Sequence, residues 1–421
     1  MKRYLQLGVV YLGSFTSWFF VVSIVVYGYI VNSFPGQGSL TVLMMSLPSL
    51  FALIGGLAAI PLMRIMSKKS IVMIALCLSL CGGLIIRFMG TNSLTFALIG
   101  TALTGLPAGL LPSVNNVTLT FIAPEKLRDK VIGFDYAVLS LGMVMVQALA
   151  GYLASDGDWA SAYNVFYLII PIIILTVFFY PSVNSDNTND IAMTTTTESE
   201  KGTSLSIKSV LSIVPKFIIA LLVVRFIAGF FYIGFPYNVS DYFINERNIS
   251  SSQVGMGASI GNFFGIFATA FIFIWMKKLK RFSLMIALVV VAMAGIFCIT
   301  LPSNYAVILG WIFAGMGALI FSSAVNTLVI LGFKGRIAEI ISSLCIVAMF
   351  SGEFLAGYVN PLLSKLIFGD VTALNNILVA SMGCIVMGIV SVPFCKNAYK
   401  HLYLSKKTDS YESIEDSETA M

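Results

Sequence analysis

Two charged residues lie in the middle of long apolar segments, where an ion is costly. Apolar residues fill the segment between Lys216 and Arg225 and continue after Arg225. Glu353 lies about midway between Arg336 and Lys365. A charge inside a bilayer costs a few kcal/mol on insertion scales, so such a residue is expected to have a partner or a function. Arginine can attract an anionic or strongly polar solute, and glutamate can take up and release a proton. The alternative is a structural ion pair that joins two helices.

Further polar and aromatic residues lie at similar depths in other apolar segments. These candidates for a solute site are Ser17, Trp18, Thr104, Tyr232, Asn262 and Asn326. Solute sites are mostly apolar with a few converging polar groups, which fits this set. Each residue taken singly could equally form a hydrogen bond between packed helices.

The remaining chemistry-bearing residues exclude several kinds of protein. The chain has a single histidine, His401, close to its C-terminus, and its six cysteines lie in or at the ends of apolar segments. We therefore predict no metal site, no cofactor and no catalytic site based on histidine, and hence a protein that is not an enzyme. No P-loop pattern is present, which argues against direct ATP-driven transport.

The elements that carry these residues are membrane helices. Hydrophobic residues make up 58% of the 421 residues and charged residues only 10%, with a mean hydropathy of +0.93. Apolar runs of about 20 residues recur, each long enough to cross a bilayer. The predicted segments cover residues 1–30, 40–63, 70–88, 93–122, 131–154, 161–180, 214–237, 252–276, 282–301, 305–332, 338–363 and 374–395. The fold class expected is an all-α membrane protein of twelve transmembrane helices.

A polar stretch divides these segments into two sets of six. Residues 181–213 are rich in Thr, Ser and Asp and cannot bury enough apolar surface to fold alone, which predicts a linker. We expect an N-terminal six-helix bundle in 1–180, a C-terminal bundle in 214–395 and a tail in 396–421.

The basic residues predict the orientation. Most of the 25 Lys and Arg residues fall near the N-terminus, in alternate loops, in the linker and in the tail. The positive-inside rule then places the linker and both termini in the cytoplasm, in a multi-pass protein of the cell (inner) membrane. The same distribution accounts for the net charge of +6 with the lipid bilayer as partner and no nucleic acid.

Internal repeats relate the two halves. Ser140–Leu153 resembles Ile346–Val359, with LAGY in common at a shift of 206, and Lys68–Leu76 resembles Lys280–Leu288 at a shift of 212. Two similarities in the same order indicate a duplicated, pseudo-symmetric bundle. The first repeat aligns Glu353 with Gln147, so one half has an ionisable acid where the other has a neutral amide.

With this 6+6 plan, three motifs resemble those of the major facilitator superfamily. Ile60–Lys69 is similar to the family pattern G-x-L-x-D-R-x-G-R-K, with the leucine and basic pair kept and Arg64 in place of the acid. Val146–Gly151 is similar to the end of the segment-five antiporter pattern without its proline, and Gly100–Asn116 to the glycine-rich fourth helix. The resemblance covers about residues 4–395. It implies alternating access, in which two bundles rock about a central site.

The resemblance also implies where charged residues meet. The family's acid before segment three contacts the start of segment eleven, so Arg64 and Glu339 are candidates for a charge-inverted cytoplasmic gate. Pseudo-symmetry offers Asp135 with Lys277 or Lys278 as a second gate contact.

Family topology likewise makes segments seven and eleven neighbours, so Arg225 and Glu353 are expected to be able to form a pair near the midplane. The function predicted from these features is a secondary active transporter of a small organic solute, coupled to protons and acting as a monomer. The alternatives are a drug or metabolite exporter of the same fold, and a non-transporting membrane receptor or scaffold.

Overall fold

The computed structural model describes residues 2–123, 128–181, 214–330 and 335–418, and every regular element in these ranges is a helix. The N-terminal bundle contains α1 (Lys2–Phe15), α2 (Val22–Ser33), α3 (Gly38–Thr41), α4 (Leu43–Ile65), α5 (Lys68–Ile85), α6 (Leu94–Ile122), α7 (Arg128–Leu153), η4 (Trp159–Leu168) and α8 (Ile169–Phe179). The C-terminal bundle contains α11 (Lys216–Tyr232), α12 (Gly234–Asp241), η5 (Tyr242–Glu246), α13 (Ser251–Ala270), α14 (Ile272–Leu279), α15 (Ser283–Thr300), α16 (Ser303–Ile330), α17 (Gly335–Phe368) and α18 (Ala373–Glu418).

Long apolar runs make these elements helical, because a helix satisfies its own backbone groups where lipid cannot. Ten stretches of the described chain are long and apolar enough to cross a membrane. The apolar part of α7, Ala137–Leu153, is shorter. Each of the twelve predicted segments corresponds to one, two or three consecutive helical elements.

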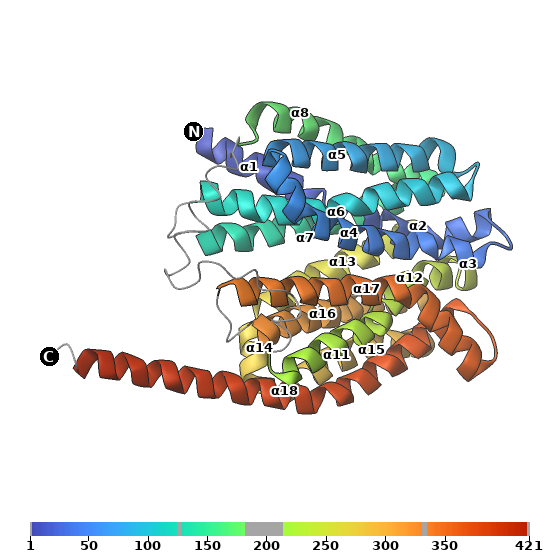
Figure 1. Cartoon of the computed structure of the whole chain (residues 1–421). Helices are drawn as coiled ribbons and strands as arrows, with labels where there is room; N and C mark the ends of the chain where they lie inside the picture. Colours follow the sequence, from blue (N-terminus) through green and yellow to red (C-terminus); the bar gives the residue numbers. More distant parts are fainter. Residues whose placement is uncertain (1, 124–127, 182–213, 331–334, 419–421) are drawn as a thin grey trace.

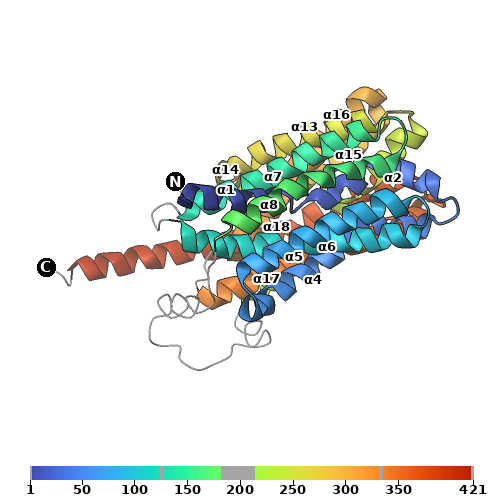
Figure 2. The ribbon, with the colours of Figure 1, turned by 90° about the horizontal axis from the view of Figure 1, so that it is seen from above.

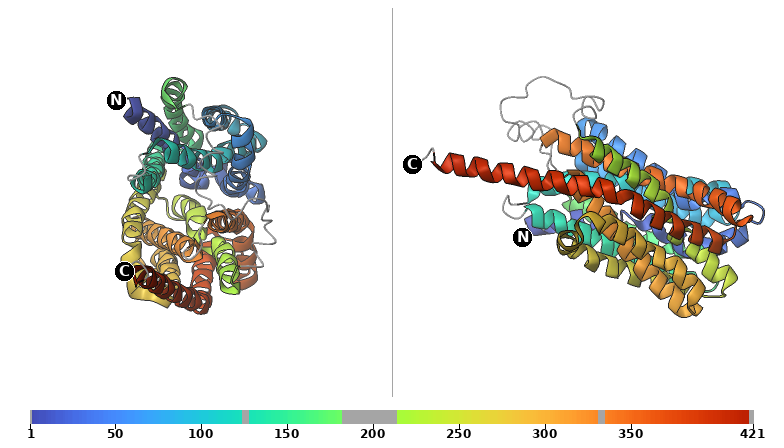
Figure 3. Two further views of the ribbon diagram at one scale, coloured as in Figure 1. Left: turned by 60° about the vertical axis from the view of Figure 1, so that its left-hand side comes forward. Right: turned by 90° about the horizontal axis from the view of Figure 1, so that it is seen from below.

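The two sets of helices lie side by side and run roughly parallel (Figure 1). Viewed along the helices, the N-terminal bundle lies on one side and the C-terminal bundle on the other (Figure 3). The start of α1 and the end of α18 lie at the same end of the molecule, where α18 extends past its neighbours (Figure 2). We call this the near end and the opposite one the far end.

The first and seventh segments are both interrupted near their middle. In the first, α1 ends at Phe15 and i→i−3 hydrogen bonds follow, including Ser17 N to Ser14 O at 3.0 Å and Phe19 N to Thr16 O at 3.2 Å. In the seventh, α11 ends at Tyr232 and α12 starts two residues later. These equivalent breaks give each bundle one segment that changes direction beside the other bundle.

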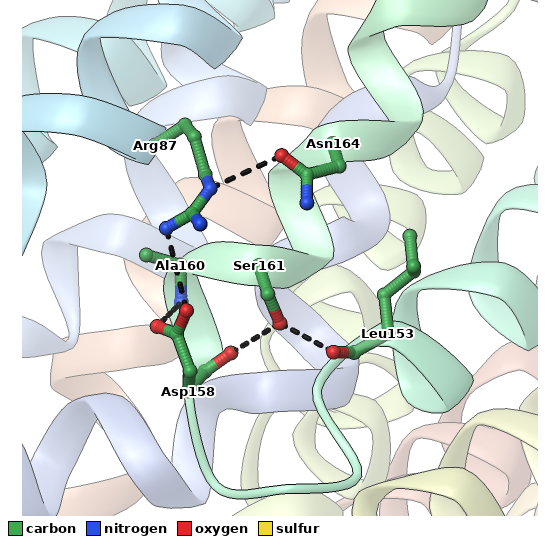
Figure 4. A network of polar contacts seen from close by, with 6 residues as sticks. All are labelled: Arg87, Leu153, Asp158, Ala160, Ser161 and Asn164. Carbon is green, nitrogen blue, oxygen red and sulfur yellow. Dashed lines mark hydrogen bonds and ion pairs between the residues drawn. The ribbon is translucent and has the colours of Figure 1, made fainter.

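At the far end, a polar network closes the turn between α7 and η4 (Figure 4). Arg87 forms an ion pair with Asp158 at 3.3 Å and donates to Asn164 Oδ1 at 3.1 Å. The Ser161 hydroxyl donates to the carbonyls of Leu153 and Asp158, and the Ala160 N–H donates to the Asp158 carboxylate at 3.1 Å. The network holds the loop that connects the fifth segment to the sixth.

The buried apolar core continues from one bundle to the other at the far end. One cluster joins the interior of the N-terminal bundle to residues of α12 and α13, such as Phe235 and Val254. A second cluster, which includes Leu221 and Phe321, fills the rest of the C-terminal bundle. The bundles are thus packed together at the far end.

Candidate functional site

The carboxylate of Glu353 lies between the two bundles and is held by both. Its side chain is 8% exposed. Ser49 of α4 donates to Oε2 at 3.3 Å, and the hydroxyl of Tyr232, the last residue of α11, donates to Oε1. The Ser49 hydroxyl also lies 3.5 Å from that of Tyr237 in α12. Glu353 therefore connects α17 to the N-terminal bundle and to both sides of the break in segment seven.

Glycines on either side of Glu353 allow these helices to approach. A Cβ on Gly352 would lie 2.3 Å from the Phe226 carbonyl of α11, and one on Gly357 would lie 2.5 Å from Val42 at the start of α4. Real Cβ atoms do not approach other atoms this closely, so a larger residue would push the helices apart. The glycines thus bring the carboxylate within reach of its two hydroxyl donors.

Arg225 does not form the predicted pair with Glu353. Its side chain is 1% exposed, and its guanidinium donates to the carbonyls of Cys345 and Ser322, both at 3.1 Å, and to Met349 Sδ at 3.0 Å. The ion pair that we see between described residues is Arg87–Asp158, at the far end. Backbone carbonyls satisfy the guanidinium without a carboxylate, and Arg225 ties α11 to α16 and α17.

Gln147, the repeat counterpart of Glu353, also lies at the bundle interface. Its Oε1 accepts a hydrogen bond of 2.6 Å from Asn262 of α13. Close by, Ser259 donates to the Val144 carbonyl at 2.7 Å. The structure therefore joins the predicted residues Gln147 and Asn262 in a neutral contact across the interface.

The other predicted solute-site residues lie apart from these contacts. Ser17 and Trp18 occupy the break after α1; Ser17 is buried and its hydroxyl has no hydrogen-bond partner among the described residues. Thr104 donates to the carbonyl of Thr101 in its own helix at 2.9 Å. Asn326 accepts from Cys345 Sγ at 3.0 Å inside the C-terminal bundle. These positions match helix packing, and the break in segment one is the exception because it leaves a buried hydroxyl unpaired.

Of the two predicted gate contacts, the one between Asp135 and Lys277 falls on described residues, and it is not formed. Arg64 is exposed near the end of α4, and the side chain of Glu339 lies outside the described residues. Asp135 is 2% exposed within the N-terminal bundle, whereas Lys277 is exposed, and no ion pair joins the two. Both contacts remain predictions for a conformation in which the near end is closed.

Sequence reasoning did not identify Ser49 and Tyr237. Ser49 is a single hydroxyl in an apolar segment, and nothing in its sequence distinguishes it from other serines that bond to their own helix. Tyr237 follows Tyr232 by five residues, and the two lie on either side of the Ile233–Gly234 break. Two tyrosines around a helix break were the available signal.

Hydrogen bonds between the bundles, where both residues are described, lie at mid-depth or toward the far end. They include Gly28 N to Ser240 Oγ at 3.1 Å, and Asn32 to Asn245 at 2.6 Å. Ser251 likewise donates to the Gly151 carbonyl at 3.0 Å. The described residues thus show the bundles joined at the far end.

Solved structures with the same arrangement are transporters. The structure superposes on a bacterial homologue of the human lysosomal transporter Spinster, in an inward-facing and unoccupied conformation, with a TM-score of 0.70, 14% identity and coverage of 96% of this chain and 98% of that one. It also superposes on a D-xylose–proton symporter, with a TM-score of 0.69, 13% identity and coverage of 94% and 97%. At these identities the likeness shows the fold alone.

Sequence comparison adds a family and a curated relative. The uncharacterized transporter YgaY of Escherichia coli O157:H7 is 28% identical over 124 residues, which are 30% of this chain and 31% of that protein. The match thus spans about a third of the relative. The profile of the Major Facilitator Superfamily matches residues 7–357. With the repeats, the helical architecture and the neighbouring structures, this match shows that the chain belongs to the Major Facilitator Superfamily of multi-pass membrane transporters.

Proposed function

We propose that this protein is a secondary active transporter of a small organic solute, driven by protons that Glu353 binds and releases. The observation that carries the proposal is the position of this carboxylate, buried at the interface with one hydroxyl donor from each bundle. A group that both bundles contact is well placed to change their relation when its charge changes.

Protonation would alter the contact in a defined way. An ionised carboxylate only accepts hydrogen bonds, whereas the protonated acid has one O–H donor and fewer acceptor sites. The Ser49 contact, at 3.3 Å, joins the bundles, so its loss or reversal would change the free energy of the conformation with the far end joined. A ligand or proton shifts such an equilibrium by its difference in affinity for the two states.

Arg225 supports this arrangement indirectly. It holds α17 against α11 through the Cys345 carbonyl and Met349, which lie about two turns and about one turn before Glu353. We therefore assign it to the positioning of α17 and no longer to direct binding of an anionic solute, because its guanidinium is buried among protein acceptors.

The orientation completes the proposal. The distribution of basic residues supports a cytoplasmic near end in a protein of the cell membrane. With the bundles joined at the far end, the conformation described here then faces inward.

Purified protein in lipid vesicles tests the proposal. A thermal-stabilisation screen of small organic solutes first identifies a ligand, and uptake is then measured with and without an imposed pH gradient. Wild type is expected to accumulate the ligand when a pH gradient drives protons in the same direction as the ligand or in the opposite direction. Glu353→Gln is expected to exchange the ligand without accumulating it. Glu246→Gln, which removes an exposed acid of η5, serves as the control. Gradient-driven accumulation by Glu353→Gln at the wild-type level would show that Glu353 is not the proton site.

A further inference from the structure

A cavity of about 340 Å³ lies toward the far end between the two bundles. Its walls come from α2, from α3 and α4, from α12, from α17 and from the start of α18. Gly38, Tyr358 and Val371 in the lining are exposed, so the cavity reaches the surface. Its volume is within the range of small-molecule sites. Tyr237 lines the cavity, and its hydroxyl contacts Ser49, which donates to Glu353.

The charge in this cavity is a carboxylate without a cationic partner. Asp241 lines the wall and accepts one hydrogen bond, from Asn245 Nδ2 at 2.6 Å. No Lys or Arg of the described chain lies within 4.0 Å of it. Arg247, nearby in sequence, donates to the Tyr242 hydroxyl at 2.9 Å and lies over that ring. A half-buried carboxylate in apolar surroundings favours a cation close by.

A second acceptor in the same wall also lacks a partner. Asn376 is 6% exposed, and its Nδ2 donates to Asn238 Oδ1 at 2.9 Å. Its Oδ1 is buried without a hydrogen bond. Leaving such an acceptor unpaired costs about 1–3 kcal/mol. This oxygen is covered by neighbouring protein atoms, so the acceptor that we assign to the cavity is the Asp241 carboxylate.

The remaining lining suits the body of an organic cation. Tyr27, Tyr237 and Tyr358 line the cavity together with apolar side chains. Tyrosine rings attract ammonium groups through their electron-rich faces. The start of α18 does not offer an open anion site, because the Thr372 hydroxyl already accepts the Asn375 N–H at 3.1 Å.

We propose that this cavity binds an organic ammonium ion, in which a protonated primary or secondary amine is attached to a small apolar body. The amine lies at the Asp241 carboxylate, and the apolar body packs on the tyrosine rings. The proposal stands apart from transport and from Glu353. Because both bundles contribute walls, a bound cation stabilises the conformation in which the far end is joined.

Calorimetric titration of the purified full chain with three probes of one shape tests the site. The probes are 2-phenylethylamine, the neutral 2-phenylethanol and the anion 3-phenylpropanoate. The amine is expected to bind wild type more tightly than the other two, and Asp241→Asn to weaken the amine by about tenfold to a hundredfold, as for hydrogen bonds to a charged group. Asp370→Asn is the matched control, since Asp370 is exposed beside the cavity and does not line it.

A gain of binding separates the proposal from damage to the fold. Asn376→Asp adds a second negative charge to the wall of the cavity and is expected to tighten the amine several-fold, with the alcohol unchanged. Equal binding of the three probes, or equal losses in Asp241→Asn and Asp370→Asn, would overturn the site. So would unchanged or weaker amine binding by Asn376→Asp at an unchanged unfolding temperature.

Discussion

The two bundles contact each other through equivalent positions with different chemistry. Gln147 of α7 accepts from Asn262 of α13, and its repeat counterpart Glu353 of α17 accepts from Ser49 of α4. In each case the fifth segment of one half meets the second segment of the other. The amide contact has one protonation state, whereas the carboxylate contact has two. Duplication thus supplied two similar contacts, and only one of them can respond to protons.

The side chains that join helices inside each bundle also differ, because Asn115 is neutral and Arg225 is charged. The N-terminal bundle joins α1, α6 and the end of segment six through neutral groups: Asn115 donates to Ser14 at 2.9 Å and accepts from Tyr180 at 3.0 Å. The C-terminal bundle uses the guanidinium of Arg225. A charged donor thus supports the packing of the C-terminal bundle, whereas Asn115 joins its neighbours in the N-terminal bundle through neutral groups.

The largest expected effect comes from removing the charged support. Arg225→Met removes the hydrogen bonds from a charged donor that join α11 to α16 and α17, and a hydrogen bond to a charged group contributes about 1.5–3 kcal/mol. We expect a loss of about 2–5 kcal/mol in unfolding free energy, measured by thermal or denaturant unfolding in detergent.

Asn115→Leu is the comparison in the N-terminal bundle, where smaller losses are expected because Asn115 itself bonds to the neutral groups of Ser14 and Tyr180. If Asn115→Leu loses as much unfolding free energy as Arg225→Met, the charge of Arg225 does not make its contacts more stabilising than neutral ones.

Making the two interface contacts alike should abolish coupling. Glu353→Gln gives both sides an amide, and accumulation of ligand driven by a pH gradient is expected to fall at least about tenfold, while exchange persists. Vesicle uptake and counterflow measure the two activities.

The reverse change, Gln147→Glu, gives both sides an acid. It is expected to add a second pH-dependent step to exchange, because a carboxylate then accepts from Asn262. An unaltered pH profile would show that the α7–α13 contact does not take part in the conformational change.

Asn262→Leu removes the donor of the neutral contact and leaves the Gln147 carbonyl oxygen unpaired. Hydrogen bonds between membrane helices average about 0.6 kcal/mol and reach about 1.7 kcal/mol, so we expect a loss in that range from unfolding assays. The ratio of accumulation with and without a pH gradient should stay at the wild-type value. A changed ratio would show that the Gln147–Asn262 contact, as well as the Glu353–Ser49 contact, takes part in proton coupling.

The smallest effect is expected from Ser49→Ala. At 3.3 Å its bond to Glu353 is long, and Tyr232 still contacts the other oxygen. We expect a change of about 0.5–1 kcal/mol in the balance between conformations, seen as a shift of a few-fold in the labelling rate of a single cysteine introduced at Ser46, beside Gly357. Ser259→Ala is the matched control at the other contact.

The sequence predicted the helical segments and the alignment of Gln147 with Glu353, because apolar run length and the repeats do not depend on packing detail. It also predicted that Arg225 would have a partner or a function, but the partner it offered, Glu353, was wrong. It did not reveal that those acceptors are backbone carbonyls, since every residue has one and only the packing of α16 and α17 brings two together. For the same reason Ser49 could not be recognised as a partner of Glu353.

The glycine of the LAGY repeat affects how the two bundles can move against each other. Its glycine is Gly151 in one half and Gly357 in the other, and both lie where the bundles cross. Gly151 faces the backbone of Gly255, and a Cβ there would lie 2.6 Å from the Ser251 carbonyl. Two backbones in direct contact can roll on each other without any side chain changing rotamer. Gly357 instead faces Val42, a stiff branched side chain. The crossing at Gly151 is therefore expected to resist rocking less than the crossing at Gly357. The rocking axis is expected to lie nearer Gly151.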